Sequence, residues 1–207
     1  MEDITPYFIL VLLWIVYFAL HSLLAARRIK DFLKNKMGRK LARYYRLLYN
    51  IFAVLSIVPV LFYNALISTK VLVPLDWKAI ISFLGLAIST YGIIVTRLAF
   101  RQYSLKEFLG LKQLKNEEEE AFNTQGILGA VRHPLYFGGL LILLGFWLFA
   151  PTLANLITVV MLVLYILVGI RFEEQKLVEQ YGDAYKKYQQ EVPMLIPKRN
   201  ALKQLRK

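Results

Sequence analysis

The chain has 207 residues, of which 57 % are hydrophobic, and its mean hydropathy is +0.48. Because an average soluble domain is only about 45–50 % apolar, this composition argues against a soluble protein. The formal net charge is +12, and the chain contains no cysteine and two histidines, which excludes a disulfide framework and a thiolate zinc site and argues against any histidine-built metal centre.

Five uncharged apolar runs predict five membrane spans. They cover residues 4–26, 51–69, 79–96, 135–150 and 153–170. About twenty apolar residues suffice to cross a bilayer, and a soluble domain of this length cannot bury five such runs. The first run follows two acidic residues and is too long for a secretory signal, so we expect it to be a span. The predicted fold is therefore all-α, a polytopic membrane helical bundle.

The basic residues between the spans predict the orientation in the membrane. Nine Lys or Arg lie from Arg27 to Arg46, six from Arg97 to Arg132 and nine from Arg171 to Lys207, which leaves only Lys70 and Lys78. Because cytoplasmic loops carry the excess of Lys and Arg, we place the N-terminus outside and the C-terminus in the cytoplasm, in a bacterial inner membrane. Anionic membrane lipids therefore explain the net charge better than nucleic acid does.

The segments between the spans predict cytoplasmic surface helices and one tight hairpin. Residues 27–46 predict a short interfacial helix that is broken near Gly38, and residues 104–114 predict an amphipathic helix that begins with capping-box spacing. The four acids at 117–120 predict a solvated loop, because consecutive carboxylates point in different directions. The three residues 150–152 between the last two runs predict an antiparallel helical hairpin.

The hairpin brings two polar clusters to one end of the bundle. The first is Arg132-His133-Pro134-Leu135-Tyr136, before the fourth span, and the second is Arg171-Phe172-Glu173-Glu174, after the fifth. Neighbouring helices pack ~8–10 Å apart, so we expect His133, Tyr136 and Glu173 to line one pocket. Proline suits the first turn of a helix, whose open N–H groups, together with Arg132, would attract a carboxylate or phosphate. An ordinary helix start and two solvated carboxylates explain the same residues equally well.

Two further features have modest interpretations. Tyr181, Tyr185 and Tyr188 share one face of a predicted helix that could fold back on the membrane-proximal site, although an amphipathic helix alone also explains them. His21 lies in an apolar run near the cytoplasmic end of the first span. We interpret it as a hydrogen-bonded histidine inside the bundle.

Taken in order, these clusters resemble the isoprenylcysteine carboxyl methyltransferase superfamily of membrane enzymes. The resemblance covers Gly126 to Pro197, with an Arg-His-Pro-x-Tyr-x-Gly motif that ends at Gly138, the hairpin, a Glu-Glu pair, Tyr-Gly-x-x-Tyr-x-x-Tyr and a closing Val-Pro. It implies S-adenosylmethionine as cofactor, bound near the cytoplasmic face. The cofactor-binding residues that it implies are His133, Tyr136 and Glu173, with Gly126, Leu128, Arg132, Pro134 and Leu135 around them.

The rest of the chain is similar to a bacterial branch of this superfamily, the methanethiol S-methyltransferases and the nitrite-reductase-associated (NnrU-like) membrane proteins. The shared stretches are 20–25, 44–50, 109–113, 170–174 and 192–197. Gly169 stands where the prenylcysteine enzymes have a substrate-contacting arginine, and Leu128 stands where they often have tyrosine. The resemblance therefore implies a small thiol or another lipophilic acceptor, with Arg171 and Glu174 as candidate catalytic residues.

This interpretation divides the chain into an N-terminal three-span membrane region, 1–100, and a cofactor-binding methyltransferase region, 101–207. The expected partners are membrane lipids and the small substrate, with no nucleic acid. Several alternatives stay open: a prenylcysteine-type carboxyl methyltransferase, a phospholipid methyltransferase, and an accessory membrane protein of a respiratory or nitrogen-oxide pathway. Reduction of a double bond, as in sterol reductases, is a weaker alternative because a nicotinamide dinucleotide needs more phosphate-binding groups than the sequence offers.

Overall fold

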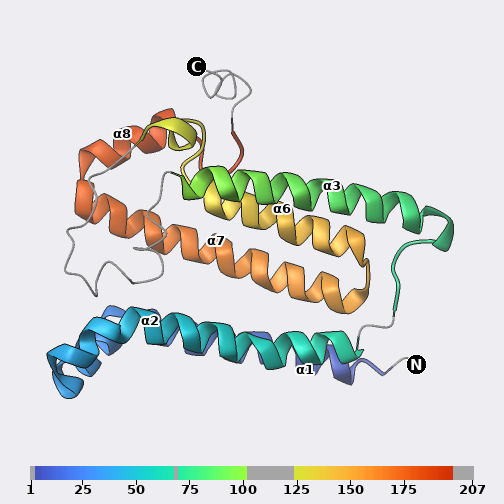
Figure 1. The fold of residues 1–207 in the computed structure, drawn as a ribbon, viewed down its shortest axis with the longest axis horizontal. Coiled ribbons are helices and arrows are strands. Elements are labelled where there is room, and N and C mark those ends of the chain that lie inside the picture. The colour runs from blue at the N-terminus through green and yellow to red at the C-terminus, as the bar shows by residue number, and fades with distance from the viewer. Residues whose placement is uncertain (1–2, 68–69, 102–123, 198–207) are drawn as a thin grey trace. The chain divides into compact units, whose positions relative to one another are not determined.

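The computed structural model describes residues 3–67, 70–101 and 124–197, and these residues are almost entirely helical. An isolated β-bridge pairs Val71 with Thr152. The elements, shown in Figure 1, are α1 (Thr5–Ala25), α2 (Arg27–Ile67), α3 (Leu75–Phe100), the 3-10 helix η1 (Gly126–Gly129), α6 (Pro134–Phe149), α7 (Leu153–Tyr181) and α8 (Asp183–Glu191).

The helices confirm the predicted all-α, polytopic membrane fold. Four of them contain segments long and apolar enough to cross a bilayer: Thr5–Ala25, Tyr44–Ile67, Asp76–Phe100 and Leu153–Tyr181. The fourth predicted span, 135–150, corresponds to α6, which has 16 residues and is shorter. Large apolar side chains such as Phe62 and Phe83 are 65 % and 70 % exposed, as expected for helix faces that contact lipid. The chain is a multi-pass integral membrane protein.

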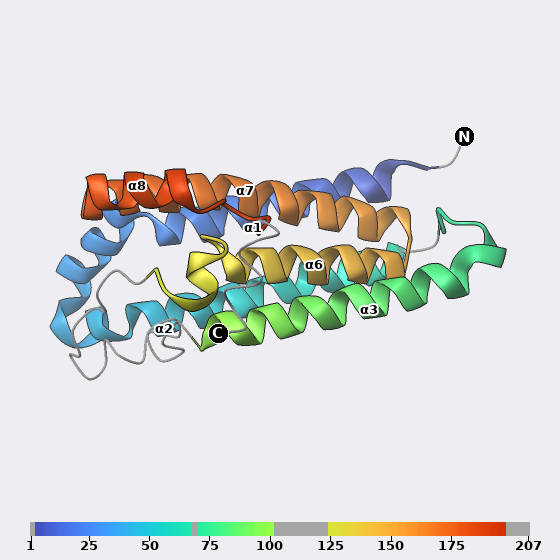
Figure 2. The same ribbon diagram turned by 90° about the horizontal axis from the view of Figure 1, so that it is seen from above.

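The predicted break near Gly38 is wrong, because α2 is one continuous helix of 41 residues. A single glycine costs a helix only about 1 kcal/mol relative to alanine, and the Lys, Arg, Leu and Met residues around Gly38 are good helix formers. The ribbon does change direction within the first part of α2 (Figure 2). The amphipathic helix predicted at 104–114 and the acidic loop at 117–120 lie outside the described residues.

The described residues form two compact units. One contains those within Met1–Leu72 and Thr152–Met161, and the second contains those within Val73–Tyr103, Glu120–Pro151 and Leu162–Lys207. The single helix α7 therefore contributes its first turns to one unit and the remainder to the other. The proposed division at residue 100 concerns function and stays a prediction.

In the first unit, α1 and α2 are antiparallel neighbours joined by tyrosine side chains. Tyr45 donates a hydrogen bond to the Leu24 carbonyl at 2.6 Å, and the Tyr49 hydroxyl lies 2.6 Å from His21 Nε2. The prediction that His21 is hydrogen-bonded within the bundle is therefore confirmed.

A chain of buried polar side chains links α1 and α2 to the first turns of α7. Trp14 Nε1 donates to Thr158 Oγ1 at 3.0 Å, Thr158 donates to Asn64 Oδ1 at 2.8 Å, and Asn64 Nδ2 donates to Asn155 Oδ1 at 2.8 Å. All four residues are at most 5 % exposed. Buried polar groups between membrane helices are stable only when paired in this way, so the network fixes the register of the three segments.

In the second unit, glycines allow α3 and α6 to run side by side (Figures 1 and 2). A Cβ atom added at Gly85 would lie 2.6 Å from the Gly145 carbonyl oxygen, and one added at Gly92 would lie 2.8 Å from that of Gly138. Backbone contact this close excludes any side chain at these positions. It also fixes α6, whose first residues belong to the predicted site, against a long neighbouring helix.

Candidate functional site

Two glycines with positive φ angles shape the chain around the candidate site. Gly126, with φ of 59°, begins η1, and Gly182, with φ of 56°, lies between α7 and α8. Glycine adopts this left-handed conformation without the penalty that a Cβ atom imposes. The turn at Gly182 reverses the chain, so that α8 returns along the end of α7.

The return of α8 is stabilised by the tyrosine face that the sequence predicted. Tyr185, Tyr188 and Val192 are buried together against Leu177, Val178 and Tyr181 on α7 and the turn. Tyr188 donates a hydrogen bond to the Leu128 carbonyl at 2.6 Å. Burial raises the pKa of Tyr188 to about 12, so its hydroxyl keeps the proton that this bond requires. The prediction that this helix folds back on the membrane-proximal residues is confirmed.

The segment after α8 pairs with the residues that precede α6. The backbone N–H of Arg132 donates to the Pro193 carbonyl at 2.9 Å, and that of His133 donates to the Met194 carbonyl at 3.1 Å. These two N–H groups are therefore bonded within the chain and not open to an anion. The guanidinium of Arg132 strengthens the pairing, because its Nη1 donates to the carbonyls of Gln189 and Val192.

Glu174 lies at the centre of the site and accepts three side-chain hydrogen bonds. Its Oε1 accepts from Arg132 Nε at 2.7 Å and lies 3.1 Å from His133 Nε2, and its Oε2 accepts from Gln189 Nε2 at 3.1 Å. The Arg132 and His133 side chains are 9 % and 4 % exposed, and that of Glu174 is 15 % exposed. Charge-assisted bonds in so sheltered a setting hold the carboxylate ionised and fixed in position.

The other predicted site residues differ in their burial and in their contacts. Pro134 is buried at the start of α6, and the Tyr136 ring centroid lies 5.6 Å from that of His133. Glu173 has a buried Oε2 atom that accepts no hydrogen bond from any described residue. The predicted pocket paired His133 with Glu173, whereas in the described residues the side chains of Arg132 and His133 contact Glu174.

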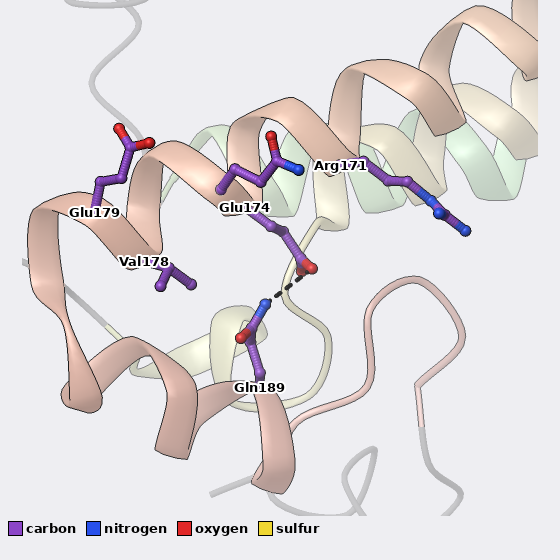
Figure 3. A pocket seen from close by; sticks show the side chains of 6 residues that line it. Arg171, Glu174, Val178, Glu179 and Gln189 are labelled. Atoms are coloured by element: carbon purple, nitrogen blue, oxygen red, sulfur yellow. Dashed lines mark hydrogen bonds between the residues drawn. The ribbon is translucent and has the colours of Figure 1, made fainter.

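An open pocket of about 400 Å³ lies between α7 and α8, lined by Arg171, Glu174, Gln175, Val178, Glu179 and Gln189. Figure 3 shows Glu174 and Gln189 pointing toward each other across it. The two residues predicted to be catalytic, Arg171 and Glu174, therefore line one pocket. The described residues include no group of three His, Cys, Asp or Glu side chains that could hold a metal ion.

The sequence did not single out Gln189, which orients Glu174 from α8. A glutamine in an amphipathic helix carries no distinguishing pattern, so only its contact reveals its role. The buried network in the first unit did leave a signal. Asn64, Asn155 and Thr158 are polar residues inside predicted spans, and such residues are candidates for buried contacts.

Together these features define a polytopic helical membrane protein whose last two helices and C-terminal segment enclose a cluster of charged and aromatic residues at one end. The chain belongs to the family DUF1295, described as a protein of unknown function, whose model matches residues 6–192. Its relatives also confirm the superfamily and the bacterial branch that the sequence motifs indicated.

Several relatives are named methanethiol S-methyltransferase. The protein from Pseudomonas sp. (strain GM41(2012)) is 38 % identical over 105 residues, which are 50 % of this chain and 39 % of that protein. Methanethiol S-methyltransferase 1 from Bradyrhizobium diazoefficiens is 29 % identical over 199 residues, 92 % of this chain and 67 % of that protein. The chain thus spans about two-fifths of the Pseudomonas protein and two-thirds of the Bradyrhizobium protein. No solved structure matches the chain.

Proposed function

We propose that the chain is a membrane methyltransferase that transfers a methyl group from S-adenosylmethionine to a small thiol. The observation that carries the proposal is the hydrogen bond between His133 and Glu174, residues 41 positions apart that belong to the two motifs shared with the superfamily. Relatives named methanethiol S-methyltransferase support the same reaction and a thiol acceptor. When bound, the cofactor would supply an electrophilic methyl group on a positively charged sulfur.

The residues around the site fit such a cofactor. Glu173 Oε2 is buried and has no hydrogen-bond partner among the described residues, and leaving a carboxylate oxygen in that state is costly unless a ligand pairs with it. S-adenosylmethionine has an ammonium group and ribose hydroxyls that can donate to it. We assign binding to Glu173, His133 and Tyr136, with the wall of the site formed by Gly126, Leu128, Arg132, Pro134 and Leu135.

Two residues of α7, Gly169 and Arg171, favour a thiol as the methyl acceptor. A Cβ atom added at Gly169 would meet no atom of the described residues within 4 Å, so α7 has open space at this position, and glycine itself supplies no cation. A carboxylate without a cationic partner would lose hydration at a high cost, whereas a neutral thiol would lose little. Arg171 lies two residues further along, in the pocket that contains Glu174. There its positive charge would favour the thiolate, which is the nucleophilic form.

We propose that the site lies on the cytoplasmic face. The distribution of basic residues supports this, because 24 of the 26 Lys and Arg belong to segments that the positive-inside rule assigns to that side. An apolar thiol can reach the site from the bilayer. Holding donor and acceptor in line can supply several kcal/mol of the barrier reduction.

Two measurements on detergent-purified protein test the proposal. The first is binding of S-adenosylhomocysteine. Glu173→Gln should weaken binding about 5- to 150-fold, the equivalent of losing ~1–3 kcal/mol. Glu191→Gln, which removes an exposed carboxylate from α8, should leave it unchanged.

The second measurement is methyl incorporation from labelled S-adenosylmethionine into methanethiol, longer alkyl thiols and a prenylcysteine analogue. We expect incorporation into the thiols and not into the prenylcysteine carboxylate. Incorporation into the carboxylate alone would contradict the proposed acceptor and leave the methyltransferase assignment in place. Failure to bind S-adenosylhomocysteine would contradict both.

A further inference from the structure

We infer that His133 Nδ1 accepts the proton of the acceptor thiol, and that Glu174 is the positioning residue that prepares it for this step. The inference rests on the proposed function and extends it, because binding of the cofactor by His133 does not require a particular ring nitrogen to be unprotonated. It follows from the hydrogen bonds that surround the imidazole.

The contact between His133 and Glu174 determines which ring nitrogen is free. His133 Nε2 lies 3.1 Å from Glu174 Oε1, and the same oxygen accepts a bond from Arg132 Nε at 2.7 Å. An ionised carboxylate can only accept hydrogen bonds, so the Nε2 atom must carry its hydrogen. In the neutral imidazole the lone pair then lies on Nδ1, which makes no hydrogen bond with any described residue.

The surroundings hold the ring in this orientation. The His133 backbone N–H is bonded to the Met194 carbonyl at 3.1 Å, and the side chain is 4 % exposed. Gln189 fixes Glu174 from the other side, with its Nε2 donating to Glu174 Oε2 at 3.1 Å (Figure 3). Two fixed neighbours and a bonded backbone leave the imidazole little freedom to rotate, which is the condition for an efficient general base.

One carboxylate lies between the ring and the nearest cation. Glu174 Oε1 lies 3.1 Å from His133 Nε2 and 2.7 Å from Arg132 Nε, so the Arg132 charge faces the ring across a carboxylate with which it is paired. Other titratable groups near the pair are Tyr136 on α6, Glu173 on α7, and Tyr185 and Tyr188 on α8. Burial raises the pKa of Tyr185, so this tyrosine stays neutral throughout the physiological range and adds no charge.

The S–H proton of the acceptor moves to His133 Nδ1, and the sulfur lone pair forms a bond to the methyl carbon. The bond between that carbon and the cofactor sulfur breaks, and its electron pair neutralises the sulfonium. The products are a methyl thioether and S-adenosylhomocysteine, and the proton leaves His133 to water before the next turnover. No oxidant or reductant is required.

The first test reads the protonation of the ring directly and does not depend on activity. The chain has two histidines, so ¹⁵N-histidine NMR of the purified protein gives two imidazoles, which His133→Asn and His21→Gln assign. We expect the neutral His133 ring to carry its hydrogen on Nε2. In Glu174→Gln the amide oxygen should take the position of Oε1, because Arg132 Nε donates there, so Nε2 should keep its hydrogen while the negative charge beside the ring is lost. A wild-type ring that carries its hydrogen on Nδ1 would overturn the inference.

The second test compares two acceptors that differ in acidity. For an alkyl thiol, His133→Asn and Glu174→Gln should each lower kcat by about 10²- to 10⁴-fold, the usual contribution of a general base. For an aromatic thiol that is already ionised at the assay pH, the same variants should lose less than about tenfold, since no proton has to be removed. Glu191→Gln, an exposed carboxylate on α8, is the matched control and should behave as wild type.

The outcomes separate this inference from the proposed function. Wild-type protein that methylates neither thiol would refute the function. The inference would be overturned if the wild type methylates both thiols and the variants lose equal activity toward the alkyl and the aromatic thiol. His133 and Glu174 would then act by binding or structure. A helical circular dichroism spectrum and an unfolding transition like those of the wild type show that each variant is folded. Partial rescue of His133→Ala by added imidazole with the alkyl thiol is the confirming result if His133→Asn fails to fold.

Discussion

The contact between α3 and α6 makes Gly85→Ala a sensitive test of the fold that supports the site. A Cβ atom at position 85 would lie 2.5 Å from the Phe149 nitrogen and 2.6 Å from the Gly145 carbonyl oxygen. Ordinary contacts between heavy atoms begin at about 3.5 Å, so the two helices would have to separate by roughly 1 Å. Both neighbours are backbone atoms and cannot rotate away.

Overpacking of this kind costs about 1–3 kcal/mol, which exceeds the gain of about 1 kcal/mol from replacing glycine by alanine in a helix. We therefore expect Gly85→Ala to lower the free energy of unfolding, measured by denaturation with sodium dodecyl sulfate in mixed micelles. Gly139→Ala is the matched control on α6, because an added Cβ there meets no atom within 4 Å. It should unfold as wild type does or at a higher denaturant fraction.

The double substitution examines whether the mechanism is separation of the helices. A Cβ atom at Gly145 would collide with the Gly85 carbonyl and with Ser89. Once Gly85→Ala has moved the helices apart, Gly145→Ala should cost less than it does alone, because residues in contact do not act additively. Equal unfolding of Gly85→Ala and Gly139→Ala, or strict additivity of the two interface variants, would refute the reasoning.

Three further predictions concern other parts of the chain. Asn64→Leu should lower the free energy of unfolding by about 0.6–1.7 kcal/mol, since it removes the hydrogen bonds that Asn64 makes with Thr158 and Asn155, and an unchanged unfolding transition would contradict this. Tyr188→Phe should lower the free energy of unfolding by about 1 kcal/mol and speed proteolysis of the C-terminal segment, because the buried Leu128 carbonyl loses the hydrogen bond from Tyr188. Equal cleavage rates for the variant and the wild type would count against the role of this bond. A cysteine at Asp76 should react with an impermeant thiol reagent in intact cells, whereas one at Glu191 should not, and the reverse pattern would invert the proposed topology.

The class of fold could be predicted from the sequence because its physical cause is local. A run of about twenty uncharged apolar residues is stable across a bilayer only as a helix, since the hydrocarbon offers no partner for backbone groups. The spans, the tight link at 150–152 and the returning tyrosine helix all follow from such patterns. Gly38 was misjudged because one glycine is a weak helix breaker when the flanking residues favour helix.

The partners within the candidate site were decided by the tertiary structure. The sequence placed Glu173 and Glu174 at the same end as His133, but adjacent residues on a helix point about 100° apart, and spacing cannot say which one faces the imidazole. The turn at Gly182 brings Gln189 to one side of Glu174, and the pairing of Pro193 with Arg132 fixes the guanidinium on the other. Those contacts join residues up to 61 positions apart, so they depend on the path of the whole C-terminal segment and not on any local pattern.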